Sequence, residues 1–464
     1  MPRPARRTAP APRERSAKPG KTGGSSAGSK PTQHDRILQA IVELTAKHGY
    51  QNVSIAQISS HARVSSATFY ELFEGKEDCL LAAYRATAEQ MFEQVRSQSV
   101  ADQDWHELAH AALTSLLGML RESPDAGRML FVEAAAGGPL IAEERRRVLG
   151  EFERFAQGFL DGLPSAGETL DLPPTAIVGA LRSIISRRLR TNAEDELPRV
   201  VDDVIAWIDS YRIPAGLVPW STSPEALLPG AEEELRKPAV RARPRLPRGR
   251  HGLPAGVVAR SQRSRLIFAT AEVTMEKGYA NATVADIVAK AGVARDVFYE
   301  HFTDKEHAFL EAQQYPTQHI IDSCAAAYFS AKNWPERVWK GLGTLLELIA
   351  GNPELAHLRL IQCYAAGPVA IRRAEEITRS FAIFLEEGYG YGEQGAQLPR
   401  LVSEAITGAL FEAIQRHVAR NDFAGLMPRL PQLTYVAIAP FLGPQNAVEQ
   451  IEALSAQQLE APAA

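Results

Sequence analysis

Residues 54–77 read SIAQISSHARVSSATFYELFEGKE, and residues 283–306 read TVADIVAKAGVARDVFYEHFTDKE. Ser54 and Thr283 each stand directly before a short apolar pattern of helical period, which makes them suitable N-cap residues. In both stretches a tight turn and a second short helix follow. Two short helices joined by such a turn predict a helix-turn-helix, whose second helix can lie in the major groove of DNA.

A longer helix is predicted before the first helix-turn-helix. Ile37, Ile41 and Leu44 recur at helical spacing and form an apolar stripe, and Gly49 is suited to a left-handed C-cap. Four aromatic residues of the motifs are assigned to the core: Phe69, Phe73, Phe298 and Phe302. We expect each three-helix unit to form a head on a larger body.

The two stretches belong to an internal repeat. A single offset without a gap, which places Gly278 opposite Gly49, makes 19 of the 48 positions between 36 and 83 identical to their counterparts. The same offset still aligns residues 179–181 with 408–410, far from the motif. A repeat of this kind indicates one lobe of about 180 residues that occurs twice.

Both lobes are expected to contain helices only, because apolar residues recur at intervals of three and four and alternating strand patterns are missing. The predicted fold class is all-α, with two tandem lobes. The division is a disordered basic arm (1–30), a first head (31–91, helix-turn-helix about 54–73), a first body (92–212), a Pro- and Arg-rich linker (213–259), a second head (260–320, helix-turn-helix about 283–302), a second body (321–445) and a tail (446–464).

The composition agrees with a globular chain of two or more domains. Of 464 residues, 23% are charged and 45% hydrophobic, and no apolar stretch approaches the 18 or so residues that span a bilayer. Cys79, Cys324 and Cys363 form no C-x-x-C pattern, so neither a disulfide framework nor a cysteine zinc site is expected. We expect a cytoplasmic protein without a cofactor or a metal.

The net charge of −4 conceals two strongly basic segments. Residues 1–33 carry a net charge of +7, and residues 236–265 carry +10 with no acidic residue. Basic segments on acidic bodies favour contact with a polyanion, although such segments also occur as solvated linkers. Each lies before a predicted head, where it can reach DNA phosphates or a minor groove.

The motif resembles the head of the TetR family of bacterial transcriptional regulators. The resemblance covers about 31–91 and 260–320, and beyond these ranges it is only a match of size and helical character. It implies an operator-binding head and a helical body that binds a small-molecule effector and dimerises. Family members are normally homodimers, so the resemblance implies that this one chain holds both subunits.

Physical arguments and the resemblance together assign a set of DNA-contacting residues. N–H groups and a hydroxyl at a helix N-terminus suit a phosphate oxygen, as do a phenol and an ammonium group, and side chains that begin the second helix can touch base edges. The set is Arg36, Ser54, Ser65, Ser66, Thr68, Tyr70 and Lys76 in the first head, and Arg265, Thr283, Arg295, Asp296, Tyr299 and Lys305 in the second.

The two copies differ at the turn and at the following N-cap. Gly292 occupies the turn of the second copy, but Arg63 stands there in the first, so the first turn is either strained or of another type. Ala294 stands where Ser65 caps the first copy, which removes a cap worth about 1 kcal/mol.

The second helices of the two motifs predict different base preferences. Arg295 can read guanine, and Asp296 can accept from cytosine or orient Arg295. Alternatively, Asp296 repels phosphate and the second head is degraded. If both heads bind, the operator is an imperfect palindrome with two unlike half-sites.

Two other motif matches fail on context. The pattern G-x-G-x-x-G at 390–395 has no preceding strand, and G-x-S-x-G at 24–28 lies in a low-complexity arm, so neither a nucleotide site nor a catalytic serine is expected. The histidines are scattered without metal-ligand spacing.

The expected function is that of a sequence-specific transcriptional regulator, a repressor released by a small-molecule effector of unknown identity. Residues 175–211 are expected to pack on about 402–440 within one chain, which gives a monomer that acts as a single-chain pseudo-dimer. The alternatives are a helical ligand- or protein-binding module with degraded heads and, disfavoured by the absence of an acid/base constellation, an enzyme in the helical bodies.

Overall fold

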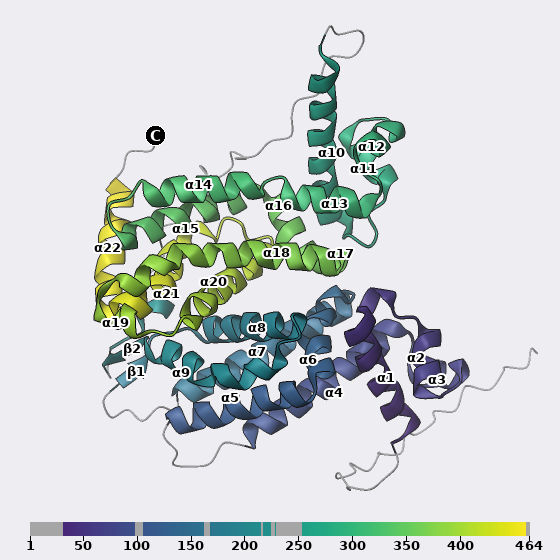
Figure 1. Cartoon of the computed structure of the whole chain (residues 1–464), viewed down its shortest axis with the longest axis horizontal. Helices are drawn as coiled ribbons and strands as arrows, with labels where there is room; N and C mark the ends of the chain where they lie inside the picture. The colour runs from purple at the N-terminus through teal and green to yellow at the C-terminus, as the bar shows by residue number, and fades with distance from the viewer. Residues whose placement is uncertain are drawn as a thin grey trace, which may run out of the picture.

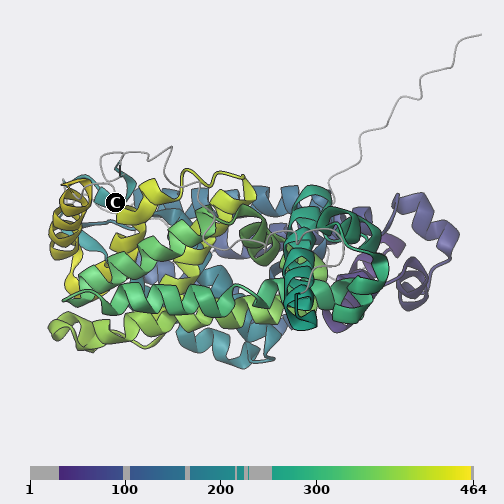
Figure 2. The same cartoon turned by 90° about the horizontal axis from the view of Figure 1, so that it is seen from above.

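The computed structural model describes residues 31–97, 105–161, 168–214, 217–223, 228 and 253–460. The predicted basic arm and most of the predicted linker lie outside these residues. The described chain forms two layers of helices, with the first lobe below the second in Figure 1 and both heads at the same end of the molecule. Figure 2 shows the two heads at this end from above.

The first lobe begins with a three-helix head, which the long helix α4 joins to the body. Its helices are α1 (Gln33–His48), α2 (Ile55–Ala62), α3 (Ser66–Leu72), α4 (Lys76–Arg96), α5 (Trp105–Glu122), α6 (Pro124–Phe131), α7 (Pro139–Asp161), α8 (Pro174–Arg190) and α9 (Val201–Asp209). Short 3-10 segments lie between some of them, namely η1 (Tyr50–Asn52), η2 (Glu133–Ala136) and η3 (Glu194–Val200), and η4 (Trp220–Thr222) follows the lobe.

The second lobe repeats this order with additional interruptions. Its α-helices are α10 (Ala255–Lys277), α11 (Val284–Ala291), α12 (Arg295–His301), α13 (Lys305–Gln314), α14 (Thr317–Phe329), α15 (Trp334–Ala350), α16 (Pro353–His357), α17 (Cys363–Ala366), α18 (Pro368–Ser380), α19 (Gly392–Gln397), α20 (Leu401–Ala419), α21 (Leu430–Leu442) and α22 (Pro444–Glu460). The π-helical turn η7 (Leu358–Gln362) and the 3-10 segments η8 (Phe381–Gly390) and η9 (Met427–Arg429) complete the lobe.

The two lobes keep the register of the sequence repeat. Helices α11, α12 and α21 begin at the repeat counterparts of the residues that begin α2, α3 and α9. The lobes differ after the head, where α4 continues to Arg96 but Pro316 separates α13 from α14. Proline lacks the N–H that an uninterrupted helix uses, which explains the break in the second lobe.

The predicted all-α fold is confirmed, with one small addition. Strand β1 (Glu168–Leu170) pairs with β2 (Arg212–Pro214) in an antiparallel sheet at the end opposite the heads (Figure 1). The sequence predicted helices only, because an alternating pattern cannot be recognised in three residues. Helices also cross two predicted boundaries, since α10 begins within the predicted linker and α22 occupies most of the predicted tail.

Side-chain caps begin three of the four short helices in the heads. The hydroxyls of Ser54 and Thr283 accept hydrogen bonds from the backbone N–H three residues later, at the starts of α2 and α11. Ser65 caps α3 in the same way, whereas Ala294 gives α12 no side-chain cap. The caps that the sequence predicted are therefore present, and the cap that it predicted to be missing is missing.

The turn inside the helix-turn-helix has the same backbone form in both heads. Gly292 has φ 63° and ψ 44°, and Arg63 has φ 55° and ψ 49°, so both residues are left-handed. This conformation costs a residue with a side chain roughly 1–2 kcal/mol. Of the two alternatives for the first turn, the strained one is therefore correct.

The predicted aromatic core of the heads is confirmed. Phe69 and Phe298 are fully buried, and Phe73 and Phe302 are almost so. The rings of Phe69 and Phe73 contact each other with their centroids 5.6 Å apart, and those of Phe298 and Phe302 do so at 5.5 Å. This packing holds the second helix of each motif against its own head.

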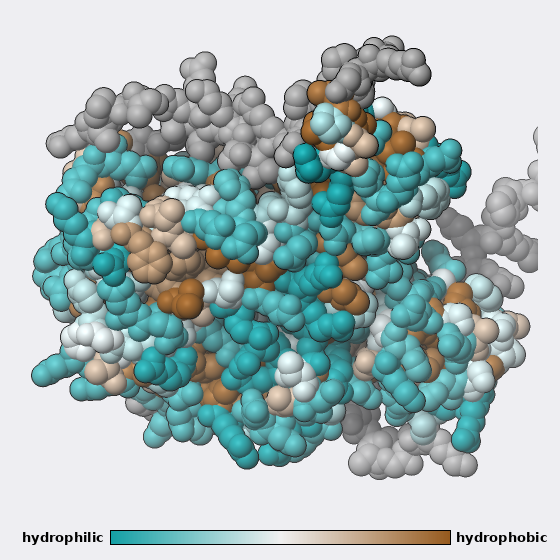
Figure 3. All heavy atoms as spheres, turned by 45° about the horizontal axis from the view of Figure 1, so that its top comes forward, coloured by the Kyte–Doolittle hydropathy of each residue, from teal (hydrophilic) through white to brown (hydrophobic). Residues whose placement is uncertain are grey.

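The face of the molecule that Figure 3 shows is mainly hydrophilic, with apolar side chains gathered in small patches. Among the described residues, no helix combines the length and the apolar character needed to cross a membrane. The same residues contain no group of three or more His, Cys, Asp or Glu side chains arranged to hold a metal ion. All three cysteines are buried and free.

The two lobes meet where α8 packs against α20. Gly179 of α8 lies against Glu412, and Gly408 of α20 lies against Ser183. The two contacts are equivalent, because the two glycines are counterparts in the repeat, and so are Ser183 and Glu412. A Cβ atom added at either glycine would lie 2.6 Å from the Cβ atom that it faces. The helices can therefore approach this closely only because both residues lack a side chain.

The ion pairs of α8 across this contact run from its arginines to glutamates of the second lobe, while one pair between the lobes has the opposite sense, Arg416 of α20 with Glu153 of α7. Arg182 Nε donates to Glu412 at 2.8 Å, and Arg187 Nε donates to Glu404 at 2.7 Å. Arg188 Nη1 also donates to Glu404, at 3.2 Å. Such charge-assisted bonds fix the orientation of the two helices as well as their contact.

Substituting Gly179 or Gly408 by alanine should destabilise the chain by about 1–3 kcal/mol, because the added methyl group overpacks the contact between α8 and α20. Unfolding in guanidinium chloride measures the change. Gly118→Ala within α5 is the matched control, since nothing lies within 4 Å of the added Cβ atom, and it should leave stability unchanged or slightly higher. Equal stability of all three variants would contradict the close approach.

Restoring the missing cap with Ala294→Ser should stabilise the second head by about 1 kcal/mol, and Ser65→Ala should destabilise the first by a similar amount. The same unfolding measurement, with hydrogen exchange of the head amides, assigns each change to its head. If Ala294→Ser has no effect while Ser65→Ala does, the start of α12 is not limited by its cap.

Candidate DNA-binding surface

The second helices of the motifs, α3 and α12, lie on the outer side of their heads (Figure 1). Tyr70 is 60% exposed and Tyr299 is 49% exposed, so both phenols are accessible to a ligand. Of the other predicted residues at this surface, Ser54, Ser65, Ser66, Thr283, Arg295 and Asp296 are exposed and Thr68 is half-buried. Each head therefore presents most of its predicted set to solvent.

The N-termini of α2 and α11 differ in charge. In α2, the Gln57 side chain accepts from the Ser54 N–H at 2.8 Å. In α11, the Asp286 carboxylate accepts from the Thr283 N–H and pairs with Lys277 at 2.6 Å, and these hydrogen bonds hold the pKa of Asp286 below its usual value. The expected phosphate site thus carries an amide in the first head and a carboxylate in the second, a difference that the predicted set did not include.

The predicted phosphate-binding lysines contact the protein's own backbone. Lys76 Nζ donates to the carbonyls of Tyr50 and Val53 at 2.9 and 2.8 Å, and Lys305 Nζ donates to the carbonyl of Tyr279 at 2.8 Å. Each ammonium lies 4.3 Å from a tyrosine ring centroid, and burial lowers the pKa of both groups. The two lysines fasten the loop before each motif, and their phosphate contact stays a prediction.

The two arginines of the first helices have different surroundings. Arg265 donates to the carbonyls of Ala291 and Gly292, at the end of α11, and so closes the turn of the second motif. Arg36 occupies the corresponding position and is half-buried, and its Nε atom has no hydrogen-bond partner among the described residues. A DNA contact of either residue stays a prediction.

Arg295 lies over the ring of Tyr299, one helical turn later. Its Nη2 atom is 3.4 Å from the phenol oxygen, its guanidinium carbon is 5.8 Å from the ring centroid, and the hydrogen bond with Tyr299 raises the arginine pKa. The sequence left Asp296 either to accept from cytosine or to orient Arg295, and both roles stay predictions; the hydrogen bond that Arg295 makes in the structure is with the tyrosine. The pair presents one cation and one hydroxyl group on the exposed side of α12.

Each head is tied to its body by a side chain that the predicted set did not include. Glu133 Oε2 accepts from the Tyr50 N–H at 3.2 Å, and Gln362 Oε1 accepts from the Tyr279 N–H at 2.9 Å. The two acceptors occupy equivalent positions of the repeat, and burial raises the pKa of Glu133. Only the repeat register, applied beyond the heads, could have indicated this pair.

Both bodies contain small cavities with mainly apolar linings. A cavity of about 60 Å³ in the first body is lined by residues that include Met91, Phe131 and Phe152. Two cavities of about 50 and 40 Å³ in the second body share Phe381 and Phe411. Such linings suit the apolar part of a ligand.

Both heads match a known protein family. The family model described as bacterial regulatory proteins, tetR family, matches residues 37–83 and 266–312. The HTH-type transcriptional activator FasR of Mycolicibacterium smegmatis is 23% identical over 172 residues, which cover 36% of this chain and 67% of FasR.

Similar solved structures include two regulators from Bacillus. The fatty acid degradation regulator FadR of Bacillus halodurans has 19% identity and a TM-score of 0.32, over 38% of this chain and 94% of its own. FadR of Bacillus subtilis in complex with stearoyl-CoA has 16% identity and a TM-score of 0.33, over 37% of this chain and 96% of its own.

The two family matches fall on the two heads and are themselves related by the repeat register. FasR is likewise described as an HTH-type regulator, that is, one with a helix-turn-helix. The chain therefore contains two TetR-type units in tandem, each with a head that matches the tetR family model.

Proposed function

We propose that this regulator binds operator DNA with both heads of one chain and represses transcription until a small-molecule effector releases it. The observation that carries the proposal is the placement of two helix-turn-helix heads at the same end of one molecule (Figure 1). Paired recognition helices contact half-sites one DNA turn apart, roughly 34–36 Å, or a multiple of this distance. One chain with two heads can therefore meet both half-sites without a second copy.

The charge on α8 supports pairing within the chain. Arg182, Arg187, Arg188 and Arg190 lie on α8, which contains no acidic residue, and they pair with glutamates of the second lobe. Two copies of the first lobe that met through α8 would place arginines against arginines. Because facing like charges disfavour an interface, we expect the first lobe to select the second.

The two heads support an operator with unlike half-sites. The first head offers the hydroxyls of Ser66 and Thr68, whereas the second offers the guanidinium of Arg295 at the position of Ser66. A guanidinium reads guanine through two acceptors, which a hydroxyl does not match. A fused chain can thus recognise a site that a homodimer, with two identical helices, would not prefer.

A second candidate is a regulator whose first head supplies most of the affinity for DNA. Asp286 at the N-terminus of α11 and the exposed Asp296 of α12 both place negative charge where phosphates would approach the second head. Selection of binding sites from random duplexes distinguishes the two: a pair of half-sites supports the proposal, and a single half-site supports this candidate. A module that binds only ligands or proteins would select no duplex.

The sign of regulation is tested separately. We propose repression, which is the usual mode in the family, although the relative FasR is named an activator. A reporter gene placed behind the selected operator should fall in expression when the chain is produced. A rise in expression would make the chain an activator without changing its proposed contact with DNA.

Without DNA, the chain should sediment as a single species of 50.7 kDa, even at concentrations well above those needed for DNA binding. With DNA, one chain should bind one operator. This result follows from an α8 surface already occupied by α20. Analytical ultracentrifugation with and without operator duplex measures both quantities. A stable dimer of chains, or two chains on each operator, would exclude the single-chain pseudo-dimer.

Substituting Arg295 by alanine should weaken operator binding by about 1–3 kcal/mol and relax the base preference in one half-site only, because a bidentate contact to guanine is lost. Binding-site selection with the variant measures the change at each position. Arg372→Gln, an exposed substitution on α18 of the body, is the matched loss of charge and should change neither half-site. Relaxed preference in both half-sites would argue against separate reading by the two heads.

A further inference from the structure

A cavity of about 250 Å³ lies between the two lobes, among α8, η7, α17, α18, η8 and α20. It is larger than the cavities within the bodies and differs from them in having many charged groups in its lining. The charged residues are Arg182, Arg187, Arg190, Arg359, Arg379, Glu375, Glu404 and Glu412. The lining therefore carries more arginines than glutamates.

The glutamates do not neutralise this excess, because each is already paired. The pairs are Glu375 with Arg190, Glu404 with Arg187, and Glu412 with Arg182. Arg188 and Arg416, which do not line the cavity, share Glu404 and Glu412. Arg359 and Arg379 form no ion pair with a carboxylate among the described residues, so two positive charges of the lining are uncompensated there.

Arg359 is the most unusual member of this group. It is only 8% exposed, its Nη1 atom donates to Thr317 Oγ1 at 3.3 Å, and its Nη2 atom has no partner among the described residues. The Nε atom of Arg190 likewise lacks one. Burial lowers the pKa of Arg359 to about 10, which reflects the cost of an unpaired buried cation.

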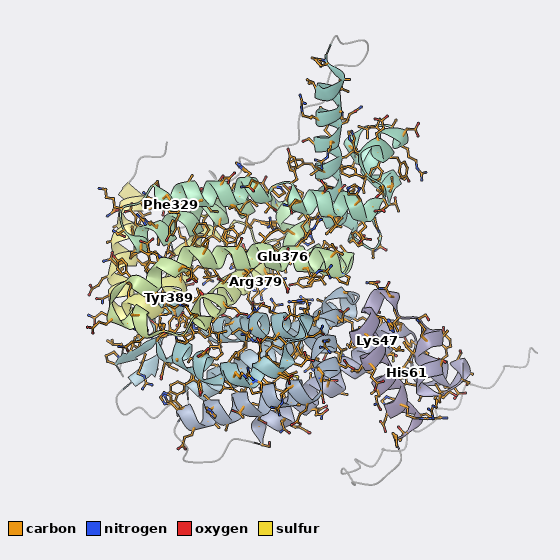
Figure 4. The ribbon with its side chains drawn as sticks, viewed as in Figure 1. Lys47, His61, Phe329, Glu376, Arg379 and Tyr389 are labelled. Atoms are coloured by element: carbon orange, nitrogen blue, oxygen red, sulfur yellow. The ribbon has the colours of Figure 1, made fainter. Side chains whose placement is uncertain are left out.

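The other uncompensated arginine is an exposed residue of the lining. This residue is Arg379, and Figure 4 shows it on the side of α18 toward the first lobe. A ligand would thus meet one accessible guanidinium and buried guanidinium donors. Arginine forks match carboxylate and phosphate oxygens better than any other ligand group.

We propose that the cavity between the lobes binds a small anion with two or more negative charges, of the phosphate or polycarboxylate class, held by Arg190, Arg359 and Arg379. This site is separate from the apolar cavities within the bodies. Its volume suits a small acid rather than a drug-sized molecule, because pockets for the latter span roughly 300–1,000 Å³.

The position of this site also links it to the heads. Gln362, which holds the second head through the Tyr279 N–H, ends the π-helical turn that contains Arg359. The charge of Arg190 acts on Glu133, which holds the first head. Segment η2, which contains Glu133, packs against α17 next to η7. An anion on these arginines would therefore act on both anchors of the heads, a step that rests on the proposed DNA-binding function.

Binding is tested on the full chain without DNA. Inorganic phosphate and citrate are titrated in a chloride buffer of constant ionic strength, and calorimetry and the thermal midpoint follow the binding. We expect saturable binding of at least one of the two probes, and the stronger probe identifies the phosphate or the carboxylate class. A response no larger than that to added chloride would overturn the proposal.

Variants separate the cavity from the remaining surface. Arg359→Met should raise the thermal midpoint of the free chain, because it removes an unpaired buried charge, and should weaken anion binding at least tenfold. Arg379→Gln, at an exposed position, should weaken binding without changing the fold, and Arg372→Gln on the same helix should leave it unchanged. Wild-type affinity in both Arg359→Met and Arg379→Gln would place the anion elsewhere and refute the site.

The link to the heads is measured last, with the selected operator. The saturating anion should change the dissociation constant of the operator complex at least tenfold in the wild type and not in Arg359→Met. An unchanged constant in the wild type would refute the coupling alone. If the chain binds no duplex but still binds the anion, the proposed function fails while the anion site stands.

Discussion

The close packing of α8 on α20 is the constraint on which the arrangement of the whole molecule depends. Gly179 and Gly408 let the two backbones approach at points related by the repeat, and the arginines of α8 pair with Glu404 and Glu412 on the facing helix. The glycines make the approach possible and the ion pairs fix its orientation. Because each head is attached to its own body, this one contact decides that both heads lie at the same end (Figure 1).

Duplication within one chain allows the two halves to diverge, and the structure shows where they have. The contact made by the glycines is nearly symmetric, but the charges on either side of it are not, since α8 is basic and its partners are acidic. A homodimer requires each surface to complement itself, whereas two different surfaces need only complement each other. The same freedom extends to the heads, where Ser66 and Arg295 occupy equivalent places.

The sequence predicted what local chemistry determines. The short helices of the heads followed from N-caps such as Ser54 and from helical period, and the tandem lobes followed from the repeat. Contacts between distant segments were not predictable in the same way. The carbonyl partners of Lys76 are 23 and 26 residues earlier in the chain, and the ion pair of Arg182 spans 230 residues. A side chain's type indicates the bonds that it can make, but only the fold supplies the partner.

The cavity between the lobes shows why such long-range placement matters for function. Arg190 comes from α8 and Arg359 from η7, and neither is unusual in sequence, yet the lobe contact brings both to one chamber. A buried guanidinium with an unused donor lowers the stability of the free protein. Stability and function often conflict at binding sites, because a group poised for a ligand is unsatisfied until the ligand arrives. Residues of the cavity also act close to both anchors of the heads, since the charge of Arg190 acts on Glu133 and Gln362 directly precedes the lining residue Cys363. Of the two anchors, only the glutamate can titrate. The asymmetry of the two heads therefore continues into the elements that hold them, so one ligand at a shared site need not act equally on both.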